Sequence, residues 1–142
     1  MTSEQNKALV RSSYETLWNE GCIDAVGTIH SADMRFHDPA APGIEGLAAF
    51  KQVIAMYRAA FAGLHFTLHD QLAEGDKVTT RWQATGIHSG EIMGIPPTGR
   101  QMSITGISID RIADGKIVEA WTNWDALGML QQLGVMPTSA PA

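Results

Sequence analysis

The chain has 142 residues, of which 44% are hydrophobic and 18% are charged, and its formal net charge is -5. This length and composition are typical of a single globular domain with one buried core. Lysine and arginine residues are scattered, so the sequence carries no electrostatic footprint for nucleic acid. No stretch approaches the roughly 18 apolar residues that a membrane span needs, and no signal-peptide pattern is present. We therefore expect a soluble, cytoplasmic protein that binds neither nucleic acid nor a membrane.

The first part of the sequence shows helical periodicity. Thr2 and Gln5 have the spacing of a capping box, and apolar residues then recur at helical intervals until Gly21. The next predicted elements are a short helix, a brief strand, a loop and a longer amphipathic helix, over residues 23–29, 34–37, 40–46 and 47–61. Three helical segments therefore precede most of the sheet.

Strands are predicted for most of the remaining chain. From residue 65 the period of the apolar residues changes from about 3.6 to 2, which indicates strands. The predicted strands cover residues 65–73, 78–89, 101–113 and 116–124, and the pairs are joined by turn residues at 74–77 and at Asp114-Gly115. Residues 90–100 contain too many glycines and prolines for a regular element, so we expect a loop. A closing helix should end at Gly134, which completes one domain over 1–136, with a flexible tail over 137–142.

This order of elements favours an α+β fold. Helices that precede a meander of long strands are expected on one face of a strongly curved antiparallel sheet, with a cavity beneath them. The last predicted strand ends Trp121-Thr122-Asn123-Trp124-Asp125, and one of its faces should line this cavity. The other face should pack on a helix or on a second subunit, because a wide exposed face bearing tryptophan is unusual for a monomer. Homodimerisation is favoured, and the pattern leaves open which face points inward.

Several polar residues are candidates for general acid-base chemistry. They are His37 with Asp38, His88, and Asn123 with Asp125. Burial raises the pKa of a carboxyl group toward neutral pH, which makes it a usable proton acceptor and donor. Each candidate also has a structural explanation. Asp125 stands where an aspartate commonly caps a helix, His37-Asp38-Pro39 has the pattern of a strand terminus, and His88 lies at the mouth of the predicted loop.

The sequence predicts no metal ion and no nucleotide. His65 and His69 are four residues apart, but a strand would separate their backbones by roughly 13 Å. The single cysteine, Cys22, cannot form an internal disulfide and is expected to pack. A phosphate-binding glycine loop and a Gly-x-Ser-x-Gly elbow are both absent from the sequence.

Six short motifs spread along the chain carry a family resemblance. They are Trp18-Asn19-Glu20-Gly21, His37-Asp38-Pro39, Gly86 to Gly90, Met93 to Arg100, Arg111 to Ile117, and Gln131 to Gly134. Together they resemble the SnoaL-like polyketide cyclases, or ester cyclases, of the nuclear-transport-factor-two-like superfamily. The resemblance implies a cone-shaped α+β barrel, a homodimer, and no metal or organic cofactor. It also implies ring closure by intramolecular aldol condensation, in which an aspartate on the last strand takes a proton next to a carbonyl.

The resemblance also implies positions for individual residues. It places the catalytic aspartate of the family at or beside Thr122, and a histidine of the preceding strand near Ser108, so neither position holds an acid or base here. Asp125 corresponds to another frequently acidic position. Pocket-lining positions of the family are matched by Trp18, His37 and His88.

The predicted function is a SnoaL-like enzyme that performs cofactor-independent acid-base chemistry, an aldol-type cyclisation or isomerisation, on a hydrophobic carbonyl compound. Asp125 would accept or donate the proton, and His88 and His37 would polarise an oxygen. The expected ligand contacts are Trp18, Met93, Ser108, Thr122, Asn123 and Trp124. Two alternatives are a non-catalytic binding domain of the same fold and an epoxide-hydrolase-like enzyme. The second requires an arginine in the pocket, for which Arg81 is the candidate.

Overall fold

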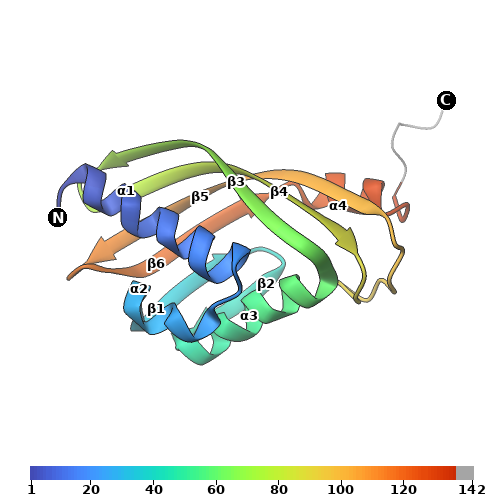
Figure 1. Ribbon diagram of the computed structural model, residues 1–142, viewed down its shortest axis with the longest axis horizontal. Coiled ribbons are helices and arrows are strands. Elements are labelled where there is room, and N and C mark those ends of the chain that lie inside the picture. Colours follow the sequence, from blue (N-terminus) through green and yellow to red (C-terminus); the bar gives the residue numbers. More distant parts are fainter. Residues whose placement is uncertain (137–142) are drawn as a thin grey trace.

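The computed structural model describes residues 1–136, which form short helices and one six-stranded sheet (Figure 1). The helical elements are α1 (Ser3–Ser12), the π-helical segment η1 (Ser13–Asn19), the 3-10 turn η2 (Ile23–Ala25), α2 (Val26–Ile29), α3 (Gly46–Ala60) and α4 (Ala126–Gln132). The strands are β1 (His30–Asp38), β2 (Ala41–Glu45), β3 (Phe61–Glu74), β4 (Lys77–His88), β5 (Gln101–Ala113) and β6 (Lys116–Trp124). The predicted tail from Pro137 lies outside the described residues. Within the described chain, every helix is too short or too polar to cross a membrane.

The sheet has the strand order β2-β1-β6-β5-β4-β3. All neighbours are antiparallel except β1 and β6, which pair in parallel, so the sheet is not purely the antiparallel meander that the sequence suggested. Both predicted hairpins are confirmed. In the β5–β6 turn, Asp114 and Gly115 have φ angles of 51° and 75°, which are the left-handed values that a tight hairpin turn needs.

The first helix begins at the predicted capping box, with the Thr2 hydroxyl accepting from the Gln5 backbone N–H. The helical region does extend to residue 19, but its second half is the π-helical segment η1. The wider turn of η1 brings Ser13, Tyr14, Leu17 and Trp18 to one buried face. Such π segments often occur at functional sites.

Two local predictions are wrong. Residues 40–46 contain the edge strand β2, which pairs with β1 at Phe36 and Ile44. An edge strand tolerates Pro42 because one side of its backbone needs no partner strand. Cys22 is exposed rather than packed, because it lies in the connection that follows η1.

The helices α1 and α3 lie across one face of the curved sheet (Figure 1). Side chains on β5 alternate strictly, and Met102, Ile104, Ser108, Asp110 and Ile112 all point to the covered, inner face. On the outer face, Ile87, Ile107 and Ile109 remain exposed. The fold therefore separates an enclosed inner face from an open outer face, as the predicted α+β cone requires.

Candidate active site

A cavity of about 80 Å³ lies between the helices and the inner face of the sheet. Its walls are mainly aromatic and include Trp18, Phe50, Phe66, Trp82 and Trp124. Ring contacts join these side chains, with the centroids of Phe66 and Trp82 4.8 Å apart and those of Trp18 and Phe66 5.3 Å apart. Aromatic walls with a few polar groups are the lining found in sites that bind small, largely apolar molecules.

Asp110, on β5, is the carboxyl group that the cavity perturbs most. It lines the cavity, its residue is 6% exposed, and its Oδ1 atom has no hydrogen-bond partner among the described residues. Burial raises the pKa of Asp110 to about 7. A carboxyl group with this pKa exists in both protonation states near neutral pH, so it can accept a proton and return it.

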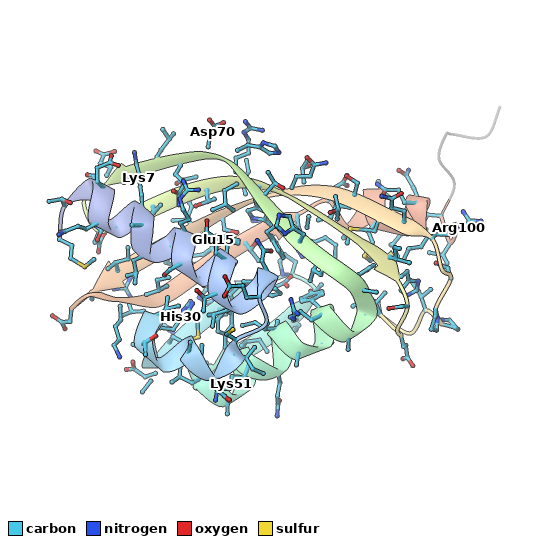
Figure 2. All side chains as sticks on the ribbon, in the orientation of Figure 1. Lys7, Glu15, His30, Lys51, Asp70 and Arg100 are labelled. Atoms are coloured by element: carbon cyan, nitrogen blue, oxygen red, sulfur yellow. The ribbon has the colours of Figure 1, made fainter. Side chains whose placement is uncertain are left out.

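Two other titratable residues that line the cavity, Tyr14 and His30, are uncharged at neutral pH. Tyr14, on η1, lies close enough that burial, and then the charge of Asp110, raise its pKa above the ordinary value. His30 lies between the helices and the sheet (Figure 2), where its Nε2 is 2.8 Å from the Ser13 hydroxyl. Burial lowers the pKa of His30 to about 3, so the ring is neutral at physiological pH. Neither residue supplies a positive charge that would hold Asp110 ionised.

Ser108 and Thr122 form a hydrogen-bonded pair on the cavity wall. They lie directly opposite each other on β5 and β6, and the Ser108 hydroxyl donates to Thr122 Oγ1 at 2.8 Å. The indole N–H of Trp82 donates to Ser108 Oγ at 3.0 Å. These are the two positions at which the family resemblance places a histidine and an aspartate. Here they hold hydroxyl groups, which cannot act as the base.

Asp38, at the end of β1, is a second buried carboxyl group on the cavity wall. It accepts hydrogen bonds from the Tyr57 hydroxyl at 2.8 Å, the Trp124 indole N–H at 3.0 Å and the Ala40 backbone N–H at 2.9 Å. Three donors leave this carboxylate little free capacity. Its contacts instead fix the rings of Tyr57 and Trp124 in the wall.

Three predicted site residues, Met93, Asn123 and Asp125, are not part of the cavity wall. Asp125 is exposed, and its Oδ1 accepts from the Gly128 backbone N–H at 2.8 Å as the N-cap of α4. Asn123 is exposed on the outer face of β6, and Met93 is 52% exposed in the loop between β4 and β5. Of the two explanations for Asp125, the geometry therefore fits the helix cap.

The two predicted histidines also lie outside the cavity. His37 is on the outer face, with Nε2 2.7 Å from a Glu119 oxygen and its ring stacked on Trp121 at 5.5 Å. His88 is fully buried, but it packs against the loop, where its Nδ1 accepts from the Thr98 backbone N–H at 3.1 Å. Within residues 1–136, no three His, Cys, Asp or Glu side chains are gathered for a metal ion.

Arg81 does not meet the requirement of the epoxide-hydrolase alternative. It is on the outer part of β4, where Nε donates to Asp70 at 2.8 Å. Both side chains are more than half exposed, so this is a surface ion pair. Arg81 therefore does not place an arginine inside the cavity.

Four predicted ligand contacts do line the cavity, namely Trp18, Ser108, Thr122 and Trp124. Asp110 and Tyr14 also line the cavity, and the sequence analysis did not include them. Strict alternation along β5 was the available signal, because it places Asp110 on the same face as Ser108. The helical spacing of Tyr14 and Trp18 likewise places both on one face of the first helix.

A strongly curved sheet closed by helices around an apolar cavity defines a nuclear-transport-factor-two-like fold. The sequence profile of the SnoaL-like polyketide cyclase family matches residues 8–133, and the chain belongs to this family. The predicted family and fold are thus confirmed.

Relatives and solved structures agree with this assignment. Aklanonic acid methyl ester cyclase DnrD of Streptomyces peucetius is 33% identical over 132 residues, which are 89% of this chain and 88% of the relative. Nogalonic acid methyl ester cyclase of Streptomyces nogalater is 34% identical over 90 residues, 63% of this chain and 67% of the relative. Among solved structures, TsrD of Streptomyces laurentii superposes with a TM-score of 0.86 at 29% identity, covering 96% of this chain and 99% of its own. IdmH of Streptomyces antibioticus gives a TM-score of 0.80 at 34% identity, covering 92% and 99%.

Proposed function

We propose that this protein is a cyclase that closes a ring in a hydrophobic carbonyl compound by intramolecular aldol addition, with Asp110 as the proton acceptor and donor. The observation that carries the proposal is the buried, incompletely hydrogen-bonded carboxyl group of Asp110, whose pKa of about 7 suits both roles. The aromatic cavity suits the apolar body of the substrate. Trp18, Ser108, Thr122 and Trp124 are the proposed ligand contacts.

The reaction needs only proton transfer and proximity. The Asp110 carboxylate takes a proton from the carbon next to a carbonyl, and the C–H electron pair forms an enolate. The enolate carbon attacks a second carbonyl of the same molecule, which forms the C–C bond and leaves an alkoxide. The alkoxide then takes the proton back from Asp110, so no atom is lost. Holding both carbonyls in one cavity supplies the entropic advantage of an intramolecular reaction.

The experiment compares Asp110→Asn with Asp125→Asn on aklanonic acid methyl ester, the compound named for the relative DnrD. Asparagine keeps the size of Asp110 but cannot take the proton, so turnover should fall about 10²- to 10⁴-fold. Asparagine at 125 still caps the helix, so turnover should be unchanged. A large loss at 125 with normal turnover at 110 would transfer the acid-base role to Asp125, as the sequence analysis first predicted.

A non-catalytic binding domain is the second candidate function. Hydroxyl groups at Ser108 and Thr122, in place of an acid and a base, favour it. This alternative predicts that wild-type protein retains a small molecule through purification, detected by native mass spectrometry, and never converts it. If the wild-type protein converts the molecule and Asp110→Asn does not, the binding-domain alternative is refuted.

We also propose that a second copy of the chain covers the outer face of the sheet. Ile107 and Ile109 are 51% and 38% exposed on adjacent positions of this face of β5, and Trp121 is opposite Ile109 on β6. An exposed apolar patch across two central strands favours an obligate neighbour. Replacing Ile109 by Glu should produce monomers in light-scattering measurements, whereas an unchanged mass would refute this interface. The cytoplasmic location stays a prediction.

A further inference from the structure

A chain of three hydrogen-bonding side chains crosses the inner face of the sheet from β4 to β6. Trp82 Nε1 donates to Ser108 Oγ at 3.0 Å, and Ser108 Oγ donates to Thr122 Oγ1 at 2.8 Å. All three residues are at most 7% exposed, and all three line the cavity. This series of hydrogen bonds therefore ends at the Thr122 hydroxyl group, on the cavity wall.

The two hydrogen bonds that join Trp82, Ser108 and Thr122 run in the same direction. An indole N–H can only donate, so it occupies one of the two lone pairs of Ser108 Oγ. Tyr14 is also hydrogen-bonded to Ser108, and its neutral hydroxyl can donate to the other lone pair. With both lone pairs occupied, the single hydroxyl proton of Ser108 goes to Thr122, whose oxygen acts as the acceptor. Thr122 still has its own proton. Among residues 1–136, its only side-chain hydrogen bond is the one that it accepts from Ser108, so this proton has no acceptor there.

The backbone is shaped to hold the first donor in place. A Cβ atom at Gly106 would lie 2.2 Å from Trp82 Cζ2, so the indole crosses β5 at the one position without a side chain. Phe66 packs on the other side of the ring system, with centroids 4.8 Å apart. Trp82 can therefore neither rotate toward β5 nor move away from Ser108 without displacing a neighbour.

We infer that Thr122 presents its hydroxyl proton to a carbonyl oxygen of the ligand, and that Trp82 and Ser108 are positioning residues that fix the direction of this donor. The inference rests on the proposed function, because the carbonyl that Thr122 binds is the one whose neighbouring carbon gives its proton to Asp110. Successive donors in one direction also polarise each other, which strengthens the last hydrogen bond.

The spacing of the two residues suits this assignment. Thr122 lies opposite Ser108, and Asp110 is two residues further along β5, so Thr122 and Asp110 are diagonal neighbours. Side chains in that relation are separated by roughly 7 to 8 Å. A carbonyl oxygen and its adjacent carbon span this gap when each makes a contact of about 3 Å with its partner. The site therefore selects ligands with a hydrogen-bond-accepting carbonyl at this position.

The test uses 1-tetralone, a bicyclic aryl ketone, and tetralin, the same ring system without the carbonyl. Thr122→Val removes the donor at nearly constant shape, and 1-tetralone should bind roughly 3- to 10-fold more weakly while tetralin binding stays the same. Thr122→Ser should restore ketone binding. Thr67→Val, the same replacement at an exposed position of β3, should leave binding of both ligands unchanged.

The infrared C=O stretch of bound, isotopically labelled 1-tetralone supplies a readout that mere packing would not change. We expect a lower frequency in wild type than in Thr122→Val, recovery in Thr122→Ser, and an intermediate value in Trp82→Phe, where Ser108 loses its fixed orientation. The same frequency in wild type and Thr122→Val would overturn the inference. Asp110→Asn separates the two proposals, since it should abolish turnover yet keep the lowered frequency. Normal turnover in Asp110→Asn would instead refute the proposed function.

Discussion

Two carboxyl groups, Asp110 and Glu119, show that the two faces of the sheet shift the pKa of a carboxyl group in opposite directions. They lie on the adjacent strands β5 and β6, one residue out of register, with Asp110 on the inner face and Glu119 on the outer face. Burial raises the pKa of Asp110 to about 7. The hydrogen bond from His37 lowers the pKa of Glu119, and Arg111 and Arg35 contribute to the same effect. A shift of one position in the register therefore exchanges a carboxyl group with a raised pKa for one whose pKa is lowered by its hydrogen-bonded and charged neighbours.

The largest expected effect tests whether stability resides on the inner side. Phe50 is 2% exposed and its ring contacts Trp18, His30 and Phe36. Phe50→Ala should lower the free energy of unfolding by about 3 to 5 kcal/mol, because it removes buried area and leaves a void. Leu72→Ala, at a residue that is 72% exposed, should change it by less than about 0.5 kcal/mol. Urea denaturation measures both, and similar losses would show that the outer surface carries comparable packing.

The second prediction concerns pH. Since the pKa of Asp110 is raised from 3.8 to about 7, the folded state binds this proton more tightly than the unfolded state does. Its contribution to stability is therefore most favourable in acid, declines as the pH rises through this window, and is fully unfavourable above pH 7. Asp110→Asn should consequently gain stability relative to wild type by a few kcal/mol between pH 4 and pH 8, as measured by denaturation at each pH.

Glu119→Gln gives the opposite sign on the outer face. Because the pKa of Glu119 is lowered, its ionised form stabilises the folded state at pH values above the ordinary pKa of a carboxyl group. This contribution is lost as the pH falls. The replacement should therefore cost stability at neutral pH and little in acid. The same pH trend for both variants would contradict the division between the two faces.

How much of this division could be predicted from the sequence depends on the strand. The β5–β6 hairpin was predictable, because Asp114-Gly115 supplies two residues that tolerate positive φ. Simple alternation along β3 would place Leu72 on the same face as Phe66, but an irregularity between Leu68 and Asp70 shifts the register, and Leu72 is exposed. Strand β2 has no apolar alternation that would mark it as a strand in the sequence. Its pairing with β1 is visible only in the structure.

The site was harder to predict than the fold, because it depends on the direction of each side chain. Thr122 and Trp124 could be assigned to one face of β6 and Asn123 to the other, but only the folded sheet shows which face is inner. Asp110 was overlooked because it lies inside a strand, where no turn or motif marks it. Its raised pKa comes from burial, which depends on the whole fold and not on any local sequence pattern.

An intermediate effect is expected where the inner face is most tightly packed. Gly106→Ala would place a methyl group against the Trp82 indole, with contacts as short as 2.2 Å, so the ring must move. Overpacking of this kind costs about 1 to 3 kcal/mol. Gly27→Ala is the matched control, because its nearest neighbour would be Leu47 Cδ1 at 3.6 Å, an ordinary contact. Denaturation followed by tryptophan fluorescence should show a loss only for Gly106→Ala, and equal stability of both variants would mean that Trp82 is not held at this position.

The smallest effect decides between the two carboxyl groups that were candidates for the base. Asp125 caps α4 through Gly128 and lies outside the cavity, so Asp125→Ala should lower the free energy of unfolding by about 1 kcal/mol, while Asp125→Asn should cost only a few tenths. Turnover per folded molecule should be the same in both variants, because neither removes a group that reaches the substrate. If Asp125 carried the proton, asparagine would preserve the cap and still abolish turnover. Stability and turnover would then respond to different replacements at one residue, which a helix cap alone cannot produce.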